Sequence, residues 1–312
     1  MTRSEAMDDH AVFDRSLLTA RRNRFAGEAS AYDFLLQRVA DDMIERLGAV
    51  QRTFPVAVDL GAHHGIIGDR LRLLPGVETV ISTDSAWRLL MQCRPPRVLA
   101  DEEFLPFRDG SLDLVVSGLA LQYVNDLPGT LVQIRRALKP DGLLLAALLG
   151  GQTLYELRDA FLQAEAEVQG GVSPRVAPFA DVRDLGSLLQ RAGFALPVTD
   201  ADVVTVTYAS PLALMRELQR MGAGNVLRAR RRLPLRRQTL MRACEIYVER
   251  YARPDGRIPA TFEIIMLTGW VPHESQQKPL RPGSAQMRLA DALGTREIGA
   301  GEKSGPVRIV KD

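Results

Sequence analysis

Cysteine is scarce in this sequence of 312 residues, which contains only Cys93 and Cys244. They form neither a CxxC pair nor a dense framework, so no structural zinc site is expected, and a reducing compartment fits the chain. Apolar runs are also short, and none reaches the roughly 20 residues that cross a bilayer. Residues 1–10 lack the apolar core of a secretory signal. These absences argue against a secreted or membrane-spanning protein.

Strong net charge is absent as well. The sequence has 40 lysines and arginines against 38 aspartates and glutamates, a net charge of +2, which gives no reason to expect nucleic acid as a partner. Hydrophobic residues make up 46% of the chain and charged residues 25%, as in ordinary soluble globular proteins. We therefore predict a soluble, cytoplasmic protein and leave peripheral contact with a membrane complex open.

Short apolar segments alternate with helical patterns through the first half of the chain. Strands are expected at residues 56–60, 77–83, 97–100, 112–117 and 143–149, with helices at 68–74 and 128–138. This alternation predicts an α/β fold of the Rossmann-like type, with a mostly parallel sheet and helices on both faces. The segment 143–149 is apolar throughout, as expected for a strand buried on both faces.

The flanking regions are less regular. Apolar residues recur at helical spacing through residues 12–47, which predicts a helical region with a basic start. The second half predicts further helices and two late strands: helices at 153–168, 181–193, 211–221 and 235–251, strands at 202–208 and 261–271.

Three parts of the chain follow from these patterns. Residues 1–50 form an N-terminal helical cap, and residues 51–272 form the main domain with a helical insertion at about 209–255. Beyond residue 273 the composition shifts to Gly, Pro, Ser, Gln and charged residues. We expect residues 273–312 to be a mostly disordered tail.

The most informative segment is the turn after the first predicted strand. It contains Asp59, Gly61 and Gly65, with His63 between the two glycines. A dinucleotide site needs a G-x-G-x-x-G array, because the pyrophosphate lies against backbone at a helix N-terminus. Counted from Gly61, the other two glycine positions hold His63 and Ile66. The turn therefore favours a smaller ligand without phosphates, such as S-adenosylmethionine.

Acidic residues also follow the next two predicted strands. Asp84 comes just after the second strand, where a carboxylate can bind a ribose diol, and Asp101 follows the third, where it can bind an adenine amino group. Ser85, Glu102 and Ser117 complete the predicted cofactor-binding residues. One such acid alone is equally compatible with a helix cap or a turn. Acids at the ends of three successive strands indicate a site.

Four further stretches carry a resemblance to a known family. They are residues 121–128 (LQYVNDLP), 150–158 (GGQTLYELR), 171–174 (GVSP), and 269–270 with 273–276 (GW and HESQ). Over residues 12–279 the chain resembles the class I S-adenosylmethionine-dependent methyltransferases. Within them it is most similar to the complex I assembly factors described as arginine hydroxylases of an NADH dehydrogenase iron–sulfur subunit, and to their bacterial relatives. The malonyl-carrier-protein methyltransferases of biotin synthesis are neighbours of this group.

The resemblance implies a seven-stranded sheet that the two late strands close as a hairpin. It implies S-adenosylmethionine as the cofactor, and an arginine of an NADH dehydrogenase iron–sulfur subunit as the substrate, in the bacterial cytoplasm or at the inner membrane. Three functions stay open: arginine modification during complex I assembly, O-methylation of a carboxyl group or small molecule such as malonyl-carrier protein, and a non-catalytic assembly chaperone.

Two places depart from the family pattern, which has a glycine at His63 and a His-Trp pair at Gln122-Tyr123. His63 either crowds the methionine end of the cofactor or donates a hydrogen bond to its carboxylate, and a positive φ there would cost about 1–2 kcal/mol. Gln122 and Tyr123 are catalytic candidates, although Tyr123 is equally compatible with a packed aromatic. Tyr155 and Arg158 are candidates for substrate contact, the alternative being a solvated helix face.

No metal site is predicted, because the side chains of adjacent His63 and His64 diverge and no metal-ligand spacing follows them. One dense basic run has leucines interleaved with six arginines: Arg228, Arg230, Arg231, Arg232, Arg236 and Arg237. A solvated surface and a docking site for an acidic partner both stay open for this run.

Overall fold

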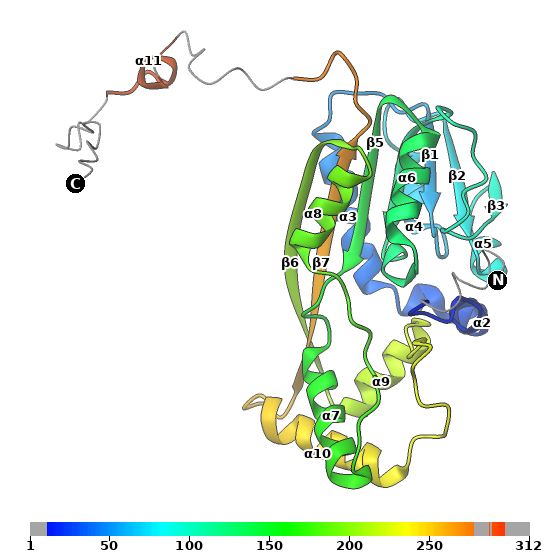
Figure 1. Ribbon diagram of the computed structural model, residues 1–312, viewed down its shortest axis with the longest axis vertical. Helices are drawn as coiled ribbons and strands as arrows, with labels where there is room; N and C mark the ends of the chain where they lie inside the picture. The colour runs from blue at the N-terminus through cyan, green and yellow to red at the C-terminus, as the bar shows by residue number, and fades with distance from the viewer. Residues whose placement is uncertain (1–10, 278–286, 288, 297–312) are drawn as a thin grey trace, which may run out of the picture. The chain divides into compact units, whose positions relative to one another are not determined.

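The computed structural model describes residues 11–277, 287 and 289–296 (Figure 1). It divides into two compact units, Met1–Glu274 and Ser275–Asp312. In the second unit the described residues include one short helix, α11 (Leu289–Leu293). Most of the tail that the sequence predicts to be disordered, residues 278–286 and 297–312, lies outside the described residues.

The first unit is built on one seven-stranded sheet, in the order β3-β2-β1-β4-β5-β7-β6. Its strands are β1 (Val56–Leu60), β2 (Thr79–Asp84), β3 (Arg97–Leu99), β4 (Leu112–Gly118), β5 (Leu138–Leu149), β6 (Ala195–Tyr208) and β7 (Ile258–Trp270). The first five strands run parallel, whereas β7 is antiparallel to both β5 and β6. The predicted Rossmann-like class is confirmed, including the antiparallel pair that closes the sheet.

Helices cover both faces of this sheet. They are α2 (Arg15–Phe25), α3 (Phe34–Gly48), α4 (Ile66–Leu71), α5 (Trp87–Leu90), α6 (Leu127–Ala137), α7 (Tyr155–Gln169), α8 (Val182–Arg191), α9 (Pro211–Arg220) and α10 (Arg237–Tyr251). In Figure 1, α6 and α8 lie on one face and α3 and α4 on the other, while α7, α9 and α10 lie past the carboxyl end of β5. Among the described residues, no helix is long and apolar enough to span a membrane.

The core has two layers that meet at β5. Successive side chains of a strand point to opposite faces, and β5 buries both: Leu143 and Leu145 pack in the layer of α3, and Leu144 and Ala146 in the layer of α6 and α8. From Leu143 to Leu148 no residue is more than 2% exposed. The prediction of a strand buried on both faces is confirmed.

The helical region predicted over residues 12–47 is not one helix. α2 ends at Phe25, the 3-10 helix η1 (Ala26–Ala31) follows, and α3 begins at Phe34. The segment AGEASA has no large apolar side chain to continue a helix face. The break lets α3 bury an apolar stripe against the sheet, whereas α2 buries only Leu18 and Arg22.

Two other elements differ from the sequence prediction. β6 begins at Ala195 rather than at residue 202, because pairing with β7 extends it through proline and aspartate, which have low strand propensity. The helix α5 was not predicted, since four residues are too short to show helical periodicity.

A buried carboxylate holds the loop after α7 against that helix. Glu165 is 1% exposed and accepts hydrogen bonds from the Ser173 backbone N–H (2.6 Å), the Ser173 hydroxyl (2.9 Å) and Arg175 Nε (2.8 Å). Burial raises the pKa of Glu165, but the hydrogen bonds from Arg175 and Ser173 outweigh it and lower the pKa overall. The motif at residues 171–174 therefore helps to hold this loop in place, through Ser173.

Replacing Glu165→Gln should destabilise the protein by about 2 kcal/mol at pH 7, because a charged acceptor that serves four donor groups of Ser173 and Arg175 is lost. The folded pKa lies below the ordinary 4.5, so this contribution is present above pH 4.5 and is lost as the pH falls through the folded pKa. Urea unfolding of both proteins at pH 7 and at pH 4 and below measures it. Exposed Glu167→Gln on the same helix is the control and should change little. A difference that does not shrink at low pH would contradict the role of the charge.

Candidate functional site

The candidate site lies where β1, β2 and β4 end, and α2 crosses these strand ends (Figure 1). Asp59, at the end of β1, is fully buried, and its Oδ2 accepts a hydrogen bond from the Gly68 backbone N–H at 2.8 Å. Its Oδ1 has no hydrogen-bond partner among the described residues. Burial raises the pKa of Asp59 to about 7. Asp59 thus points into the first turn of α4 and shapes the turn from within.

The two glycines of the turn are required by backbone geometry. Gly61 has φ +69°, and a Cβ added there would lie 2.3 Å from the Cβ of Ala120, in the loop after β4. Gly65 has φ +93°, and an added Cβ would lie 3.0 Å from Cys93 Cα. Only glycine adopts such φ values without strain. Both residues therefore keep the turn closely packed against its neighbours.

His63 also has a positive φ, 52°, which is uncommon for a residue with a side chain. Its backbone N–H donates to Asp84 Oδ2 (3.0 Å), and its ring Nε2–H donates to the Gly118 carbonyl oxygen (3.0 Å). Burial and nearby Arg22 lower the pKa of His63 to about 3, so the ring is neutral. The ring therefore has no free N–H for the first predicted role, a hydrogen bond to the cofactor carboxylate. Its position at the strand ends is compatible with the second, crowding of the methionine end of the cofactor.

The other predicted cofactor residues on β2 and β4 lie at the same edge. Asp84 is buried, and its Oδ1 accepts the Ala86 N–H at 2.6 Å. Burial raises the pKa of Asp84 to about 6. Ser85 Oγ lies 3.2 Å from Thr19 Oγ1 of α2, and Ser117 Oγ donates to the Leu60 carbonyl oxygen at 2.8 Å. Ser117 therefore links β4 to β1 and does not face open space.

Two arginines of α2, which were not predicted as site residues, complete the site. Arg15 Nη2 bonds to Asp101 Oδ1 at 2.5 Å and also to Glu102 Oε2. Burial lowers the pKa of Arg15, but the charges of Glu102 and Asp101 raise it overall. The basic start of the helical region at residues 15–24 was the available signal, since these cations precede a site rich in acids.

Arg22 is the second. Its side chain is 4% exposed, its nearest carboxylate oxygen is Glu102 Oε1 at 3.9 Å, and its guanidinium lies 5.8 Å from the ring centroid of Tyr123. It makes no hydrogen bond to any residue that the structure describes. Glu102 Oε1 and Gln122 Oε1 are buried and likewise have no hydrogen-bond partner among the described residues. A buried guanidinium held only by a long ion pair, and two buried acceptor oxygens without a hydrogen bond, thus stand beside the turn.

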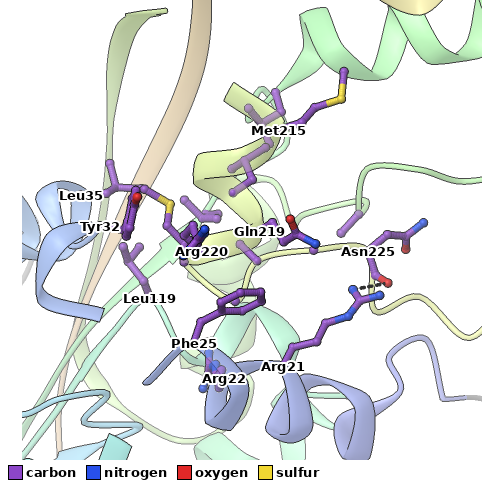
Figure 2. Close-up of a pocket in the computed structure, with 18 of the residues that line it drawn as sticks. Arg21, Arg22, Phe25, Tyr32, Leu35, Leu119, Met215, Gln219, Arg220 and Asn225 are labelled. Atoms are coloured by element: carbon purple, nitrogen blue, oxygen red, sulfur yellow. Dashed lines mark hydrogen bonds between the residues drawn. The ribbon is translucent and has the colours of Figure 1, made fainter. Parts of the chain in front are cut away.

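A cavity of about 830 Å³ opens next to these groups (Figure 2). His63, His64, Gln122 and Tyr123 line it from the strand side, and apolar residues of α3, α7, α9 and α10 line the rest. Six arginines also line it: Arg21, Arg22, Arg24, Arg175, Arg216 and Arg220. Among the lining residues the one carboxylate is Asp33, which lies 3.0 Å from His64 Nε2. The size is that of a small-molecule site, and the charge at its wall is positive.

The four catalytic candidates separate into two pairs. Gln122 donates to the Leu119 carbonyl oxygen at 2.7 Å and lines the cavity. Tyr123 also lines it but is packed edge-on against Phe13 and Phe179, so its packed-aromatic alternative holds as well.

Tyr155 and Arg158 do not line the cavity. Tyr155 is 43% exposed and packs edge-on against Tyr251 of α10 at 6.0 Å. The guanidinium of Arg158 donates to the carbonyl oxygens of Gly151 (3.3 Å) and Thr153 (3.1 Å). Arg158 thus holds the loop after β5, and its predicted substrate contact stays a prediction.

Replacing Asp59→Asn should stabilise the protein at pH 8, by up to about 4 kcal/mol. The folded pKa of about 7 lies above the ordinary 3.8, so the stability penalty is absent below pH 3.8, grows as the pH rises and is complete above pH 7. Thermal unfolding at pH 4.5 and pH 8 should show the gain mainly at pH 8. Exposed Asp109→Asn serves as the control, and equal gains at both pH values would disprove a shifted Asp59.

Comparisons with known proteins agree with this geometry. A family model described as a methyltransferase domain matches residues 58–146. The chain is 42% identical to the zebrafish (Danio rerio) mitochondrial arginine hydroxylase NDUFAF5, over 90% of this chain and 89% of that protein. It is 38% identical to the malonyl-[acyl-carrier protein] O-methyltransferase of Halorhodospira halophila, over 80% of this chain and 86% of that protein.

Among solved structures, a Bacillus halodurans protein described as a methyltransferase candidate matches with a TM-score of 0.53 at 17% identity, over 74% of this chain and 98% of that one. This match supports the fold alone, whereas the sequence identities of 42% and 38% also show the family. The chain, with its glycine turn, its carboxylates at successive strand ends and these relatives, belongs to the S-adenosylmethionine-dependent methyltransferase family, in the branch that includes the NDUFAF5 arginine hydroxylases.

Proposed function

We propose that the chain binds S-adenosylmethionine at the ends of β1, β2 and β4. The observation that carries this proposal is a set of buried groups beside the turn whose hydrogen bonding is incomplete. Glu102 Oε1 and Gln122 Oε1 accept no hydrogen bond from the described residues, and the Arg22 guanidinium reaches Glu102 only as a long ion pair of 3.9 Å. A buried polar group without a partner costs about 1–3 kcal/mol. The amino-acid end of S-adenosylmethionine has a carboxylate for the guanidinium and an ammonium for the two oxygens, so it would satisfy them together.

The predicted nucleoside contacts fit the same ligand. Asp84 accepts one backbone N–H on each oxygen, and a carboxylate oxygen has room for a second bond, here from a ribose hydroxyl. Asp101 is 35% exposed, and both of its hydrogen bonds are to Oδ1, which leaves Oδ2 for an adenine amino group. When bound, the cofactor would supply an electrophilic methyl group. Asp59, Gly61, Gly65 and Ser117 would keep the turn in shape.

Replacing Arg22→Gln should weaken S-adenosylhomocysteine binding at least tenfold, because a charged hydrogen bond to the carboxylate contributes about 1.5–3 kcal/mol. Binding of 5′-methylthioadenosine, which lacks the amino-acid end, should stay within about twofold. Calorimetric titration of both ligands measures this, with Arg21→Gln one residue away as the matched control.

Two other results would count against the proposal. Equal losses for both ligands would mean that Arg22 only supports the fold. Absence of binding by the unaltered protein would favour the non-catalytic chaperone.

We propose further that the acceptor is an arginine side chain in the iron–sulfur subunit of respiratory NADH dehydrogenase. The 42% identity to a named arginine hydroxylase over nine-tenths of the chain supports this. The relatives are mitochondrial by name, and for this chain we predict the bacterial cytoplasm, where such a subunit would be assembled.

Carboxyl O-methylation is the second candidate, and one observation favours it. Six arginines line the cavity, and three of them have no ion pair with any residue that the structure describes: Arg21, Arg24 and Arg216. This excess over the single carboxylate of Asp33 would attract an anionic acceptor and repel a cationic one. A malonyl thioester, the substrate named for the Halorhodospira relative, has the matching charge. Methyl transfer to a carboxylate needs positioning and exclusion of water and no strong base.

Mass spectrometry separates the two candidates. The NADH dehydrogenase iron–sulfur subunit should gain one oxygen or one methyl group on an arginine in cells that contain the gene, and should lack it in a deletion strain. The purified protein with S-adenosylmethionine should leave malonyl-carrier protein unmethylated. Methylation of the malonyl group with an unchanged subunit would establish the second candidate.

A further inference from the structure

One stretch of the first unit departs strongly from the charge balance of the chain. Residues 218–244, from the end of α9 to the middle of α10, contain no aspartate or glutamate. They contain eight arginines: Arg220, Arg228, Arg230, Arg231, Arg232, Arg236, Arg237 and Arg242. The near-neutral total of the whole chain conceals this local excess.

Several of these arginines are used within the fold. Arg220 pairs with Glu28, Arg230 Nη2 bonds to Asp14 Oδ2 at 3.0 Å, and Arg242 Nε bonds to Glu167 Oε2 at 2.6 Å. Four others are exposed and form no ion pair with any residue that the structure describes: Arg231, Arg232, Arg236 and Arg237. These four form what we call the basic rim.

The basic rim does not serve local stability. Arg236 is the N-cap of α10 and Arg237 its first residue, and no acidic residue lies in the first turn. The start of a helix has a partial positive charge, which cations destabilise. No capping hydrogen bond from the Arg236 side chain offsets this. The arrangement is unfavourable for the isolated protein, which indicates a role outside it.

Apolar side chains are exposed among and beside these arginines. Leu233, within the rim, is 64% exposed, and Met241 of α10 is 45% exposed. Leu235 and Leu240 of the same segment line the 830 Å³ cavity. The rim thus lies beside the cavity, and it combines cations that have no ion pair among the described residues with exposed apolar side chains.

We propose that the basic rim docks the protein on an anionic lipid bilayer. Anionic headgroups would neutralise the four guanidinium groups, and the Leu233 side chain would enter the boundary between headgroups and acyl chains. A bilayer offers anionic charge and an apolar layer together, whereas an acidic protein would need both an acidic surface and a separate pocket for Leu233. The surface is distinct from the cofactor site, so the inference stands apart from the proposed function.

Vesicle co-sedimentation of the full chain tests this proposal. The protein should bind vesicles of phosphatidylcholine with 30% phosphatidylglycerol and should not bind vesicles of pure phosphatidylcholine. High salt should release the bound protein, because it screens the attraction between the arginines and the anionic headgroups. An arginine near an anionic surface contributes roughly fivefold to binding. The quadruple variant R231Q/R232Q/R236Q/R237Q should therefore bind at least about 100-fold more weakly, and Leu233→Ser several-fold more weakly.

The control removes the same charge elsewhere, from four exposed arginines whose side chains form no ion pair with any residue that the structure describes: Arg108, Arg183, Arg191 and Arg253. It should bind the anionic vesicles within about threefold of the unaltered protein. Calorimetric titration with S-adenosylhomocysteine shows that each variant is folded and binds its cofactor. Equal losses in both quadruple variants would reduce the effect to net charge. If the protein does not bind anionic vesicles but binds poly-glutamate, the proposal is wrong and the partner of the basic rim is an acidic protein.

Discussion

The ion pairs between Arg15 and the acids after β3 are the constraint on which the site depends. Asp59, Asp84 and Glu102 are each at most 1% exposed at one edge of the sheet, and buried carboxylates close together are costly unless cations compensate them. Arg15 compensates Glu102 and also bonds to Asp101, whereas the charge of Arg22 acts on Asp84 and that of Arg72 on Asp59. The bonds of Arg15 fix α2 across the strand ends, and from this follow the wall of the cavity and the position of Arg22.

Much of this could be predicted because the signals are local. The strand predicted at 56–60 coincides with β1, and the buried character of β5 follows from its unbroken apolar run. Asp84 and Asp101 could be placed at strand ends for the same reason, since each follows a short apolar segment. A local pattern of this kind determines where a residue stands along the chain and which edge of a parallel sheet it reaches.

The roles of Arg15, Arg22 and Arg158 could not be predicted in this way. Which acids an arginine of α2 reaches depends on how that helix docks, and docking depends on the break at Ala26–Ala31, which shows no periodic signal. Arg158 belongs to a family-like motif, but a motif does not distinguish a side chain that holds a loop from one that contacts a substrate. The structure adds that Arg158 donates hydrogen bonds to the carbonyl oxygens of Gly151 and Thr153 in that loop.

The two sides of the site have opposite charge, with carboxylates at the strand ends and guanidinium groups around the cavity. A cationic sulfonium would lie toward the acids, and a negatively charged acceptor toward the arginines. An arginine acceptor would have to enter against the field of the cavity wall, and acidic neighbours in the substrate chain would offset that repulsion.

The break after α2 has one more consequence. α3 is fixed to the sheet by its apolar stripe. α2 buries little apolar surface and is held at the strand ends mainly by the ion pairs of Arg15 with Asp101 and Glu102. Arg22 comes from α2 and Gln122 from the segment after β4, so a ligand bonded to both would join the two elements. Ligand binding and helix docking would then be linked reciprocally: each would strengthen the other by the same free energy. Helix α2 would form part of the binding site, and its docking would also depend on whether that site holds a ligand.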